Sequence, residues 1–356
     1  MTNNEDELLY SIAFSILKEV PETHKINLLR QFGSAYQVYK NFKHKQINWP
    51  LREAEMELKF IHKHDIKCFS ILDDDYPNRL KHIIDAPALL FLKGSEQFNL
   101  PQLISIIGTR QHTYQVKKVV QELLEGLKHL NIGVLSGLAL GVDGIAHETA
   151  LEFNVPTWGV LAHGLDTIYP NQHRRLAIKM LDNGGLLTEC RQNTLTMPYQ
   201  FPKRNRIVAG MSDATIVIES DIEGGSMITA KLARGYDREV FAVPGKIHDT
   251  KSKGCLWLIK NQIASLYHDP VQLLQDMNWP EIIADENIND ENVQTQMILD
   301  PIPQSIYFII QAQGPIHKDN IMSQLTLNNN VLASQLLQLE LNGHIHLQAG
   351  NLYSCT

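Results

Sequence analysis

From Leu103 onward the sequence changes to short, continuous apolar runs that alternate with segments of helical periodicity. The apolar runs predict strands at 104–107, 132–135, 157–162, 186–188, 215–219 and 240–243. Strands that are apolar along their whole length and separated by helices indicate a parallel sheet that is covered on both faces. The middle of the chain is therefore predicted to form an α/β domain with a doubly wound and mainly parallel sheet.

The composition fits a globular protein with two or three domains in its 356 residues. A hydrophobic content of 44% excludes collagen-like and disordered classes. The cysteines form no C-x-x-C pair, so we expect neither a zinc site nor a disulfide framework, and their scatter favours the reducing cytoplasm. The N-terminus has no pattern of an export signal, and no stretch reaches the ~18 apolar residues that a membrane span needs.

The formal net charge of −7 is unevenly distributed along the chain. Residues 101–275 carry 18 basic and 16 acidic side chains, whereas residues 276–356 carry one basic and nine acidic. The overall balance argues against a histone-like or ribosomal nucleic-acid binder. Because the acidity lies almost wholly in the C-terminal end, the middle of the chain remains a candidate for binding a polyanion.

The sequence on either side of the α/β pattern predicts an N-terminal domain, a linker and a C-terminal domain. Residues 1–75 show helical periodicity with a stop at Gly33 and predict an N-terminal helical domain, followed by the α/β domain over 76–277. Residues 278–297 contain five acidic residues and no basic one, which indicates a solvated linker. Residues 298–356 predict a helix, a turn, two more helices and a hairpin, which is the winged-helix pattern.

Two glycine-rich turns follow predicted strands and lead into predicted helices. One runs from Ser136-Gly137 to Gly144, and the other is Gly224-Gly225-Ser226. Because the carboxyl ends of parallel strands meet at one edge, and helix N-termini favour anions, we predict a phosphate-binding edge with Arg110 beside it. Neither turn matches a known nucleotide fingerprint, so a purely structural role in tight turns remains the alternative for each turn alone.

The segment 199–206 combines two aromatic rings with three cations. Cations that follow a backbone and rings that stack on bases are what single-stranded nucleic acid requires. Pro202 favours a helix start, and Lys203 and Arg206 would then share a face. Alone, such a run is more often a solvated helix start, and Phe201 more often a core residue. Its pairing with the predicted phosphate-binding edge favours the binding interpretation.

Catalytic patterns in the sequence are weak. Asp143 and His147 stand one helical turn apart and could serve as a base with its orienting group, but a helix cap and a local hydrogen bond explain them better. Ser226 lacks the G-x-S-x-G elbow, and the histidines form no H-E-x-x-H motif. We therefore expect no catalytic residue, no metal ligands and no cofactor.

Taken together, these motifs resemble the DNA-processing protein A (DprA/Smf) family of bacterial recombination mediators. The resemblance covers about 76–267 and rests on blocks in the family's order. They are Tyr76-Pro77, Leu92-Lys93-Gly94, Gly108-Thr109-Arg110, SGLALGVDGIAH from Ser136, GLDTIYP from Gly164, FPKRNRIVAG from Phe201, GGSMITA from Gly224 and REVFAVPG from Arg238.

The resemblance implies a non-enzymatic protein that binds single-stranded DNA in a positively charged pocket of the Rossmann-like domain. It further implies a homodimer formed through that domain, and the loading of RecA recombinase onto incoming DNA during natural transformation. A SAM-like N-terminal domain and a C-terminal winged helix are also implied. Matching motif positions assign the DNA contacts to Arg110, Ser136, Gly137, Lys203, Arg204, Asn205, Arg206, Gly225, Ser226 and Thr229.

Departures from the family pattern and two alternatives accompany this prediction. The family's Tyr-Gly pair after Gly-Thr-Arg is Tyr114-Gln115 here, and Leu256 replaces the Asn of a late Ser-x-Gly-x-Asn block.

A related nucleoside-monophosphate phosphoribohydrolase is the enzymatic alternative, but the turn at 224–231 is not followed by the glutamate that such enzymes use. The winged helix could also read DNA, although Lys318 is the single basic residue in 298–356, which favours a protein contact.

Overall fold

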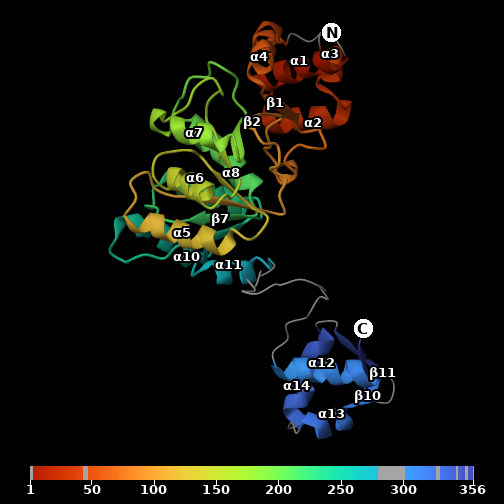
Figure 1. Ribbon diagram of the computed structural model, residues 1–356. Coiled ribbons are helices and arrows are strands. Elements are labelled where there is room, and N and C mark those ends of the chain that lie inside the picture. The colour runs from red at the N-terminus through yellow and green to blue at the C-terminus, as the bar shows by residue number, and fades with distance from the viewer. Residues whose placement is uncertain are drawn as a thin grey trace. The chain divides into compact units, whose positions relative to one another are not determined.

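A computed structural model describes residues 3–42, 47–279, 301–325, 329–341, 344–348 and 352–355. The chain divides into two compact units, Met1–Ile283 and Ala284–Thr356 (Figure 1). Apart from Asn278 and Trp279, the acidic linker predicted at 278–297 lies outside the described residues. Each unit is considered by itself below.

The first unit begins with helices, as the apolar periodicity of the N-terminal sequence predicts. They are α1 (Asn3–Ile16), α2 (Glu22–Phe32), α3 (Ala35–Phe42) and α4 (Leu51–His64). Helix α2 ends at Gly33, which adopts a φ of 76° and whose N–H bonds the Leu29 carbonyl, a left-handed cap that suits glycine. Buried side chains of α1 and α4, among them Ile12 and Ile61, pack against Phe91 of the neighbouring sheet.

The sheet of the first unit has nine strands. They are β1 (Lys67–Ser70), β2 (Leu89–Gly94), β3 (Gln102–Ile107), β4 (Ile132–Ser136), β5 (Thr157–Val160), β6 (Gly184–Thr188), β7 (Ala214–Val217), β8 (Glu239–Ala242) and β9 (Ser265–Leu266). Their spatial order is β1-β2-β6-β5-β4-β3-β7-β8-β9. Pairs β1–β2 and β2–β6 are antiparallel and the others are parallel, which confirms the predicted doubly wound, mainly parallel sheet.

Two features of this sheet differ from the sequence expectation. Strands β1, β2 and β9 are additional to the predicted ones. Because β1 pairs with β2, residues 67–70 belong to the sheet although the predicted helical domain extends to residue 75. Strand β1 is short and mostly not buried, so it lacks the apolar run by which buried strands are recognised.

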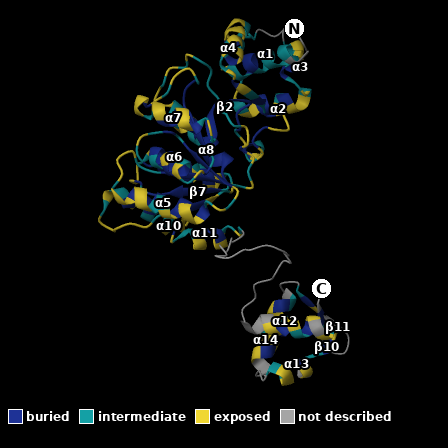
Figure 2. Cartoon of the chain, viewed as in Figure 1, coloured by how far each residue is buried: buried dark blue, intermediate teal, exposed yellow. Residues whose placement is uncertain are grey.

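Helices cover both faces of the sheet. They are α5 (Gln115–Leu127), α6 (Val142–Glu152), α7 (Arg174–Met180), α8 (Gln200–Met211), α9 (Gly225–Gly235), α10 (Lys253–Lys260) and α11 (Pro270–Asp276). Alternate residues of β3 point to opposite faces, so Ile104 and Ile106 pack with α5 and α6, whereas Leu103 and Ile107 pack with α8 and α9. Figure 2 shows the central strands, β7 among them, buried and the outer sides of α5 and α7 exposed.

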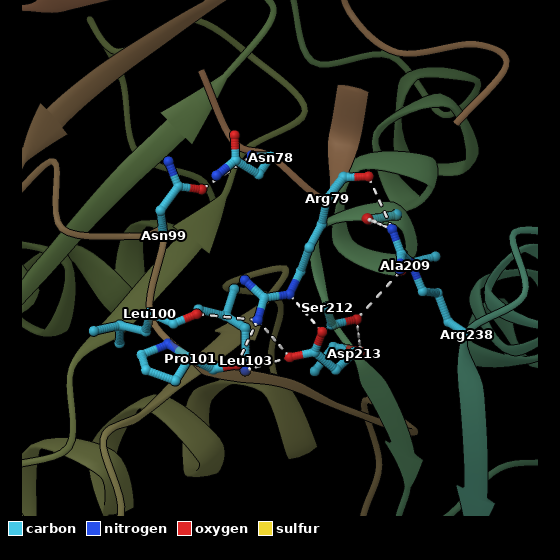
Figure 3. Close-up of polar contacts among 12 residues, drawn as sticks. Asn78, Arg79, Asn99, Leu100, Pro101, Leu103, Ala209, Ser212, Asp213 and Arg238 are labelled. Carbon is cyan, nitrogen blue, oxygen red and sulfur yellow. Dashed lines mark hydrogen bonds and ion pairs between the residues drawn. The ribbon is translucent and has the colours of Figure 1, made fainter. Parts of the chain in front are cut away.

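A polar cluster fixes the connector between β1 and β2 to the sheet (Figure 3). Arg79 Nε and Nη2 each lie 2.6 Å from a carboxylate oxygen of Asp213, and Nη2 also donates to the carbonyls of Leu100 and Pro101. The Leu103 N–H donates to the same carboxylate at 2.8 Å. Since Asp213 and Leu103 stand at the amino ends of β7 and β3, the cluster holds the edge of the sheet opposite the glycine-rich turns.

Glu57 of α4 links the helical region to the loop after β6. Its carboxylate accepts the backbone N–H of Gln192 at 3.0 and 3.2 Å, and Gln192 Nε2 donates to the Met56 carbonyl. Burial raises the pKa of Glu57 to about 7. A carboxyl group with a higher pKa in the folded chain than in the unfolded chain binds its proton preferentially in the folded state.

The Glu57 contact predicts a pH dependence of stability. As the pH falls from about 8 to about 5, protonation of Glu57 should raise the free energy of unfolding. Glu57→Gln should be more stable than the unchanged protein at the upper end of this range, and the difference should vanish at the lower end. Urea denaturation across the range measures this, with Glu55→Gln, an exposed position on the same helix, as control. Parallel pH profiles for the unchanged protein and Glu57→Gln would contradict the prediction.

The second unit contains three helices and a small sheet. Its elements are α12 (Pro301–Gln313), β10 (Ile316–His317), α13 (Lys318–Leu325), α14 (Asn329–Leu341), β11 (Ile345–Gln348) and β12 (Leu352–Cys355). The strands pair antiparallel in the order β10-β12-β11. Ile306, Ile321 and Leu336 form its core, one from each helix. This arrangement confirms the predicted winged helix.

Among the described residues, no helix has both the length and the apolar character to cross a membrane.

Candidate functional site

A cavity of about 250 Å³ opens at the carboxyl edge of the parallel strands. The ends of β3, β4 and β7 and the first turns of α8 and α9 line it, through residues that include Thr109, Gly137, Asn205 and Ser220. In the sheet, β3 lies between β4 and β7. The strand that follows β3 in the sequence, β4, lies on one side of it, and the later strand β7 lies on the other side. The cavity therefore lies at the topological switch point, where doubly wound sheets bind ligands.

The second glycine-rich turn presents an uncapped helix N-terminus to this cavity. Gly224 precedes α9 and has no side chain to cap it, and both Gly225 and Ser226 line the cavity. Within the described residues, the N–H groups of Gly225 and Ser226 have no hydrogen-bond acceptor, while the Ser226 hydroxyl donates to Ser220 Oγ at 2.7 Å. Two free donors and the positive end of the helix dipole make this turn suitable for an anion.

The first glycine-rich turn differs from the prediction that both turns offer free N–H groups. The N–H groups of Gly137 and Ala139 donate to the Asp143 carboxylate at 3.1 and 3.3 Å. Asp143 is buried, and burial raises the pKa of its carboxyl group against the opposing effect of the Arg204 charge. The N–H groups of Gly137 and Ala139 are therefore already satisfied by a side chain from α6, and the expectation that these two groups are free for an anion is corrected.

Arg204 also contacts the first glycine-rich turn. Its Nη1 donates to the carbonyls of Gly137 and Val160. The side chain lines the cavity although the residue is only 6% exposed, and its Nη2 has no hydrogen-bond partner in the described part of the chain. Burial lowers the pKa of Arg204 to about 10, so the guanidinium remains charged at neutral pH. The cavity thus has a fixed positive charge with one donor free.

The other two cations of the 199–206 run lie apart from the cavity. Arg206 is buried and its Nη2 lies 2.5 Å from the Glu189 carboxylate. Lys203 Nζ contacts the same carboxylate at 3.3 Å, and its side chain is 50% exposed. Both side chains share a face of α8, as predicted, but only Lys203 is open to solvent. Neighbouring helix positions differ by about 100° in direction, which places Arg204 toward the sheet.

The rings of Phe201 and Tyr169 lie next to each other, and the Phe201 ring lines the cavity. The Arg110 guanidinium lies 5.4 Å from the centroid of the Phe201 ring, and the Tyr169 ring lies 6.0 Å from the same centroid. Phe201 lines the cavity and Tyr169 is 48% exposed. Rings with a flanking guanidinium can stack on planar ligands. Tyr169 stands in the GLDTIYP motif, and nothing in its local pattern distinguishes it from a turn residue.

The structure brings most of the predicted site residues together. Ser136 is an exception, since it is buried and its hydroxyl donates to the Ile106 carbonyl at 2.7 Å. Those that line the cavity are Arg110, Gly137, Arg204, Asn205, Gly225, Ser226 and Thr229, whereas Ser136, Lys203 and Arg206 do not. Sequence reasoning missed Thr109, Ala139, Val208, Ser220 and Asp221, which also line it.

The possible base pair of Asp143 and His147 is not formed. His147 is fully buried and its Nδ1 hydrogen-bonds Thr157 Oγ1 at 2.7 Å, while Asp143 contacts the first turn. Burial lowers the pKa of His147 to about 3, so its ring is neutral at physiological pH. No group of His, Cys, Asp and Glu within the described residues could hold a metal ion.

Comparisons with known proteins identify two matching family models. The model for "DNA recombination-mediator protein A" matches residues 67–278, and the model for "DprA winged helix domain" matches residues 291–351. Protein Smf of Escherichia coli is 32% identical over 89% of this chain and 84% of its own length. DNA processing protein DprA of Streptococcus pneumoniae is 39% identical over 54% of this chain and 68% of its own.

Solved structures show the same similarity. DprA of Streptococcus pneumoniae superposes with a TM-score of 0.62 at 31% identity, covering 75% of this chain and 96% of that one. DNA processing protein A of Helicobacter pylori, whose structure is described as showing a unique single-stranded DNA binding mode, gives a TM-score of 0.54 at 28% identity. That match covers 60% of this chain and 95% of the other.

Proposed function

The chain belongs to the DNA recombination-mediator protein A (DprA/Smf) family, and on this premise we propose that it binds single-stranded DNA at the carboxyl-edge cavity. One observation carries the proposal. The uncapped N-terminus of α9 and the free Nη2 of Arg204 line the same cavity. These donors suit a phosphate, and the adjacent rings suit a base. Phosphate contacts and stacking together bind a strand with little regard to its sequence.

The individual contacts follow from exposure and charge. We propose that Gly225, Ser226 and Arg204 bind a phosphate in the cavity, and that Phe201 stacks on a base. Arg110 and Lys203 then contact neighbouring phosphates from the solvent side, because both are exposed. Arg206 and Ser136 act indirectly, since they are buried and bonded to protein groups.

We further propose that the protein is a cytoplasmic, non-enzymatic mediator that loads RecA recombinase onto incoming DNA during natural transformation. A homodimer formed through the Rossmann-like domain is part of the proposal. Strand β9 supports it, because it is an edge strand of the sheet and both of its residues are exposed. Leu266 on β9 and Val271 on α11 add exposed apolar side chains in the same region of the chain.

Binding of an oligothymidylate, followed by fluorescence anisotropy at several salt concentrations, tests the DNA proposal. Each neutralised phosphate of a single strand contributes about −0.7 to the slope of log K against log salt. Arg110→Ala with Lys203→Ala should therefore flatten this slope by about 1.4 and weaken binding about 20-fold at ~0.1 M salt. The weakening should be the same for oligonucleotides of different sequence.

Two outcomes would count against the proposed function. One is the absence of single-stranded DNA binding by the unchanged protein at low salt. The other is the release of adenine from AMP at an enzymatic rate, which would favour the phosphoribohydrolase alternative. A preference for one base sequence that disappears in the double variant would contradict the proposed mode of contact, although not DNA binding itself.

A further inference from the structure

A second cavity, of about 530 Å³, lies where the corner between α1 and α2 meets the first turn of α8. We call it the α2–α8 groove. Lys18 and Glu22 line it from the helical region, and Glu189, Arg191 and Lys203 line it from the α/β region. Arg204 lines both this groove and the carboxyl-edge cavity. The two hollows therefore share a wall residue.

The charges in the groove leave an excess of cations. Its two acids are already paired, Glu22 with Lys25 at 3.1 Å and Glu189 with both Lys203 and Arg206. Lys18 is exposed and Arg191 half-buried, and neither forms an ion pair with any described residue. With both carboxylates neutralised, these two side chains give the groove a net positive charge. Such a groove attracts an anionic chain.

The groove also offers donors that suit phosphate. Helix α2 has 11 residues, and its N-cap position, Pro21, has no side chain that could cap the helix. Pro21 and Glu22 line the groove, so the positive end of the helix dipole faces it. Arg204 is 6% exposed, and its Nη2, which is without a partner among the described residues, is a donor that the groove shares with the carboxyl-edge cavity. Tyr199, which is largely exposed, adds a ring to the lining.

We propose that the α2–α8 groove binds the continuation of the DNA strand whose neighbouring nucleotides occupy the carboxyl-edge cavity. The proposal rests on the proposed function and extends it, because it makes the N-terminal helical region a second DNA contact. Lys18 and Arg191 bind phosphates there, and Tyr199 stacks on a base in the groove. The groove therefore increases the length of strand that the protein covers, and the cavity alone suffices for short strands.

Oligonucleotides of two lengths distinguish binding in the carboxyl-edge cavity from binding in the α2–α8 groove. A strand of about five nucleotides fills only the cavity, whereas one of about 20 also reaches the groove. Lys18→Gln with Arg191→Gln should weaken binding of the long strand about 20-fold at ~0.1 M salt and flatten its salt slope by about 1.4. Binding of the short strand should stay unchanged. Lys18→Gln alone should weaken long-strand binding about 5-fold. This single variant still tests the groove if Arg191→Gln disturbs the fold.

The matched control is Arg52→Gln with Lys59→Gln. Both residues are exposed on α4 of the same helical region and neither lines the groove. This control should bind both strands as the unchanged protein does. If the groove variants bind the long strand normally, or lose affinity for both strands equally, the inference is overturned while the proposed function stands. Failure of the unchanged protein to bind either strand would instead overturn the proposed function.

Discussion

Replacing Gly225 with aspartate should weaken single-stranded DNA binding about 100-fold while the fold remains intact. A Cβ at this position meets no atom within 4 Å, and the glycine does not use a positive φ. The new carboxylate stands in the first turn of α9, where the helix dipole favours it, so stability should not fall. Its charge lies where we propose that a phosphate binds, and close like charges repel by about 3 kcal/mol, which is about 100-fold in affinity.

Gly235→Asp provides the control for this charge. Gly235 ends the same helix, and its Cβ position is equally open. This variant should bind DNA as the unchanged protein does and lose about 0.5 kcal/mol of stability, because a carboxylate at a helix C-terminus opposes the dipole. Anisotropy titrations and thermal melts of both variants give the comparison. Equal DNA affinity for the two would place the phosphate site elsewhere.

Arg204→Met should lower the free energy of unfolding by about 3–4 kcal/mol. The substitution removes the donor to the carbonyls of Gly137 and Val160 and takes the positive charge away from the buried Asp143. Arg204→Lys should restore little of the loss, because an ammonium on a flexible stem does not reproduce the fixed geometry of the guanidinium. Urea denaturation measures these differences.

Lys203→Met, one residue earlier, should leave the stability almost unchanged. Its side chain is half exposed and contacts Glu189 at the surface, so its removal should change stability by no more than about 0.5 kcal/mol. It should nevertheless weaken DNA binding, since the ammonium is accessible to a phosphate. If Arg204→Met were as stable as the unchanged protein, Arg204 would not be the support of the first glycine-rich turn.

The sequence predicts the centre of the fold well and its margins less well. Strands β4, β5 and β7 are buried along their whole length and β3 in all but its first residue, so an apolar run identifies each of them. Strand β9 has two residues, both exposed, and its place depends on the pairing of Phe241 and Ala242 with Ser265 and Leu266. Such a strand has no periodicity of its own that a sequence could reveal.

The candidate site shows a similar limit. The sequence identifies the cations at 203–206, but which of them are buried depends on groups far away in the chain. Arg204 is turned inward because the carbonyls of Gly137 and Val160 and the charge of Asp143 lie beneath α8. The same contact explains the glycine at 137, since a Cβ there would collide with the Arg204 guanidinium. The local sequence therefore shows that cations are present at 203–206, whereas contacts with distant parts of the chain determine which of them are buried and which are accessible.

Glu189 has a consequence for how quickly a strand can be released. It holds the Lys203 ammonium at 3.3 Å in the absence of DNA, so part of the rotamer entropy of that lysine is already lost. A phosphate that binds Lys203 replaces the Glu189 carboxylate as the partner of the ammonium group. When the phosphate dissociates, Lys203 can pair with Glu189 again. We therefore expect Glu189 to favour rapid exchange at this contact, as the proposed transfer of the strand to a recombinase requires.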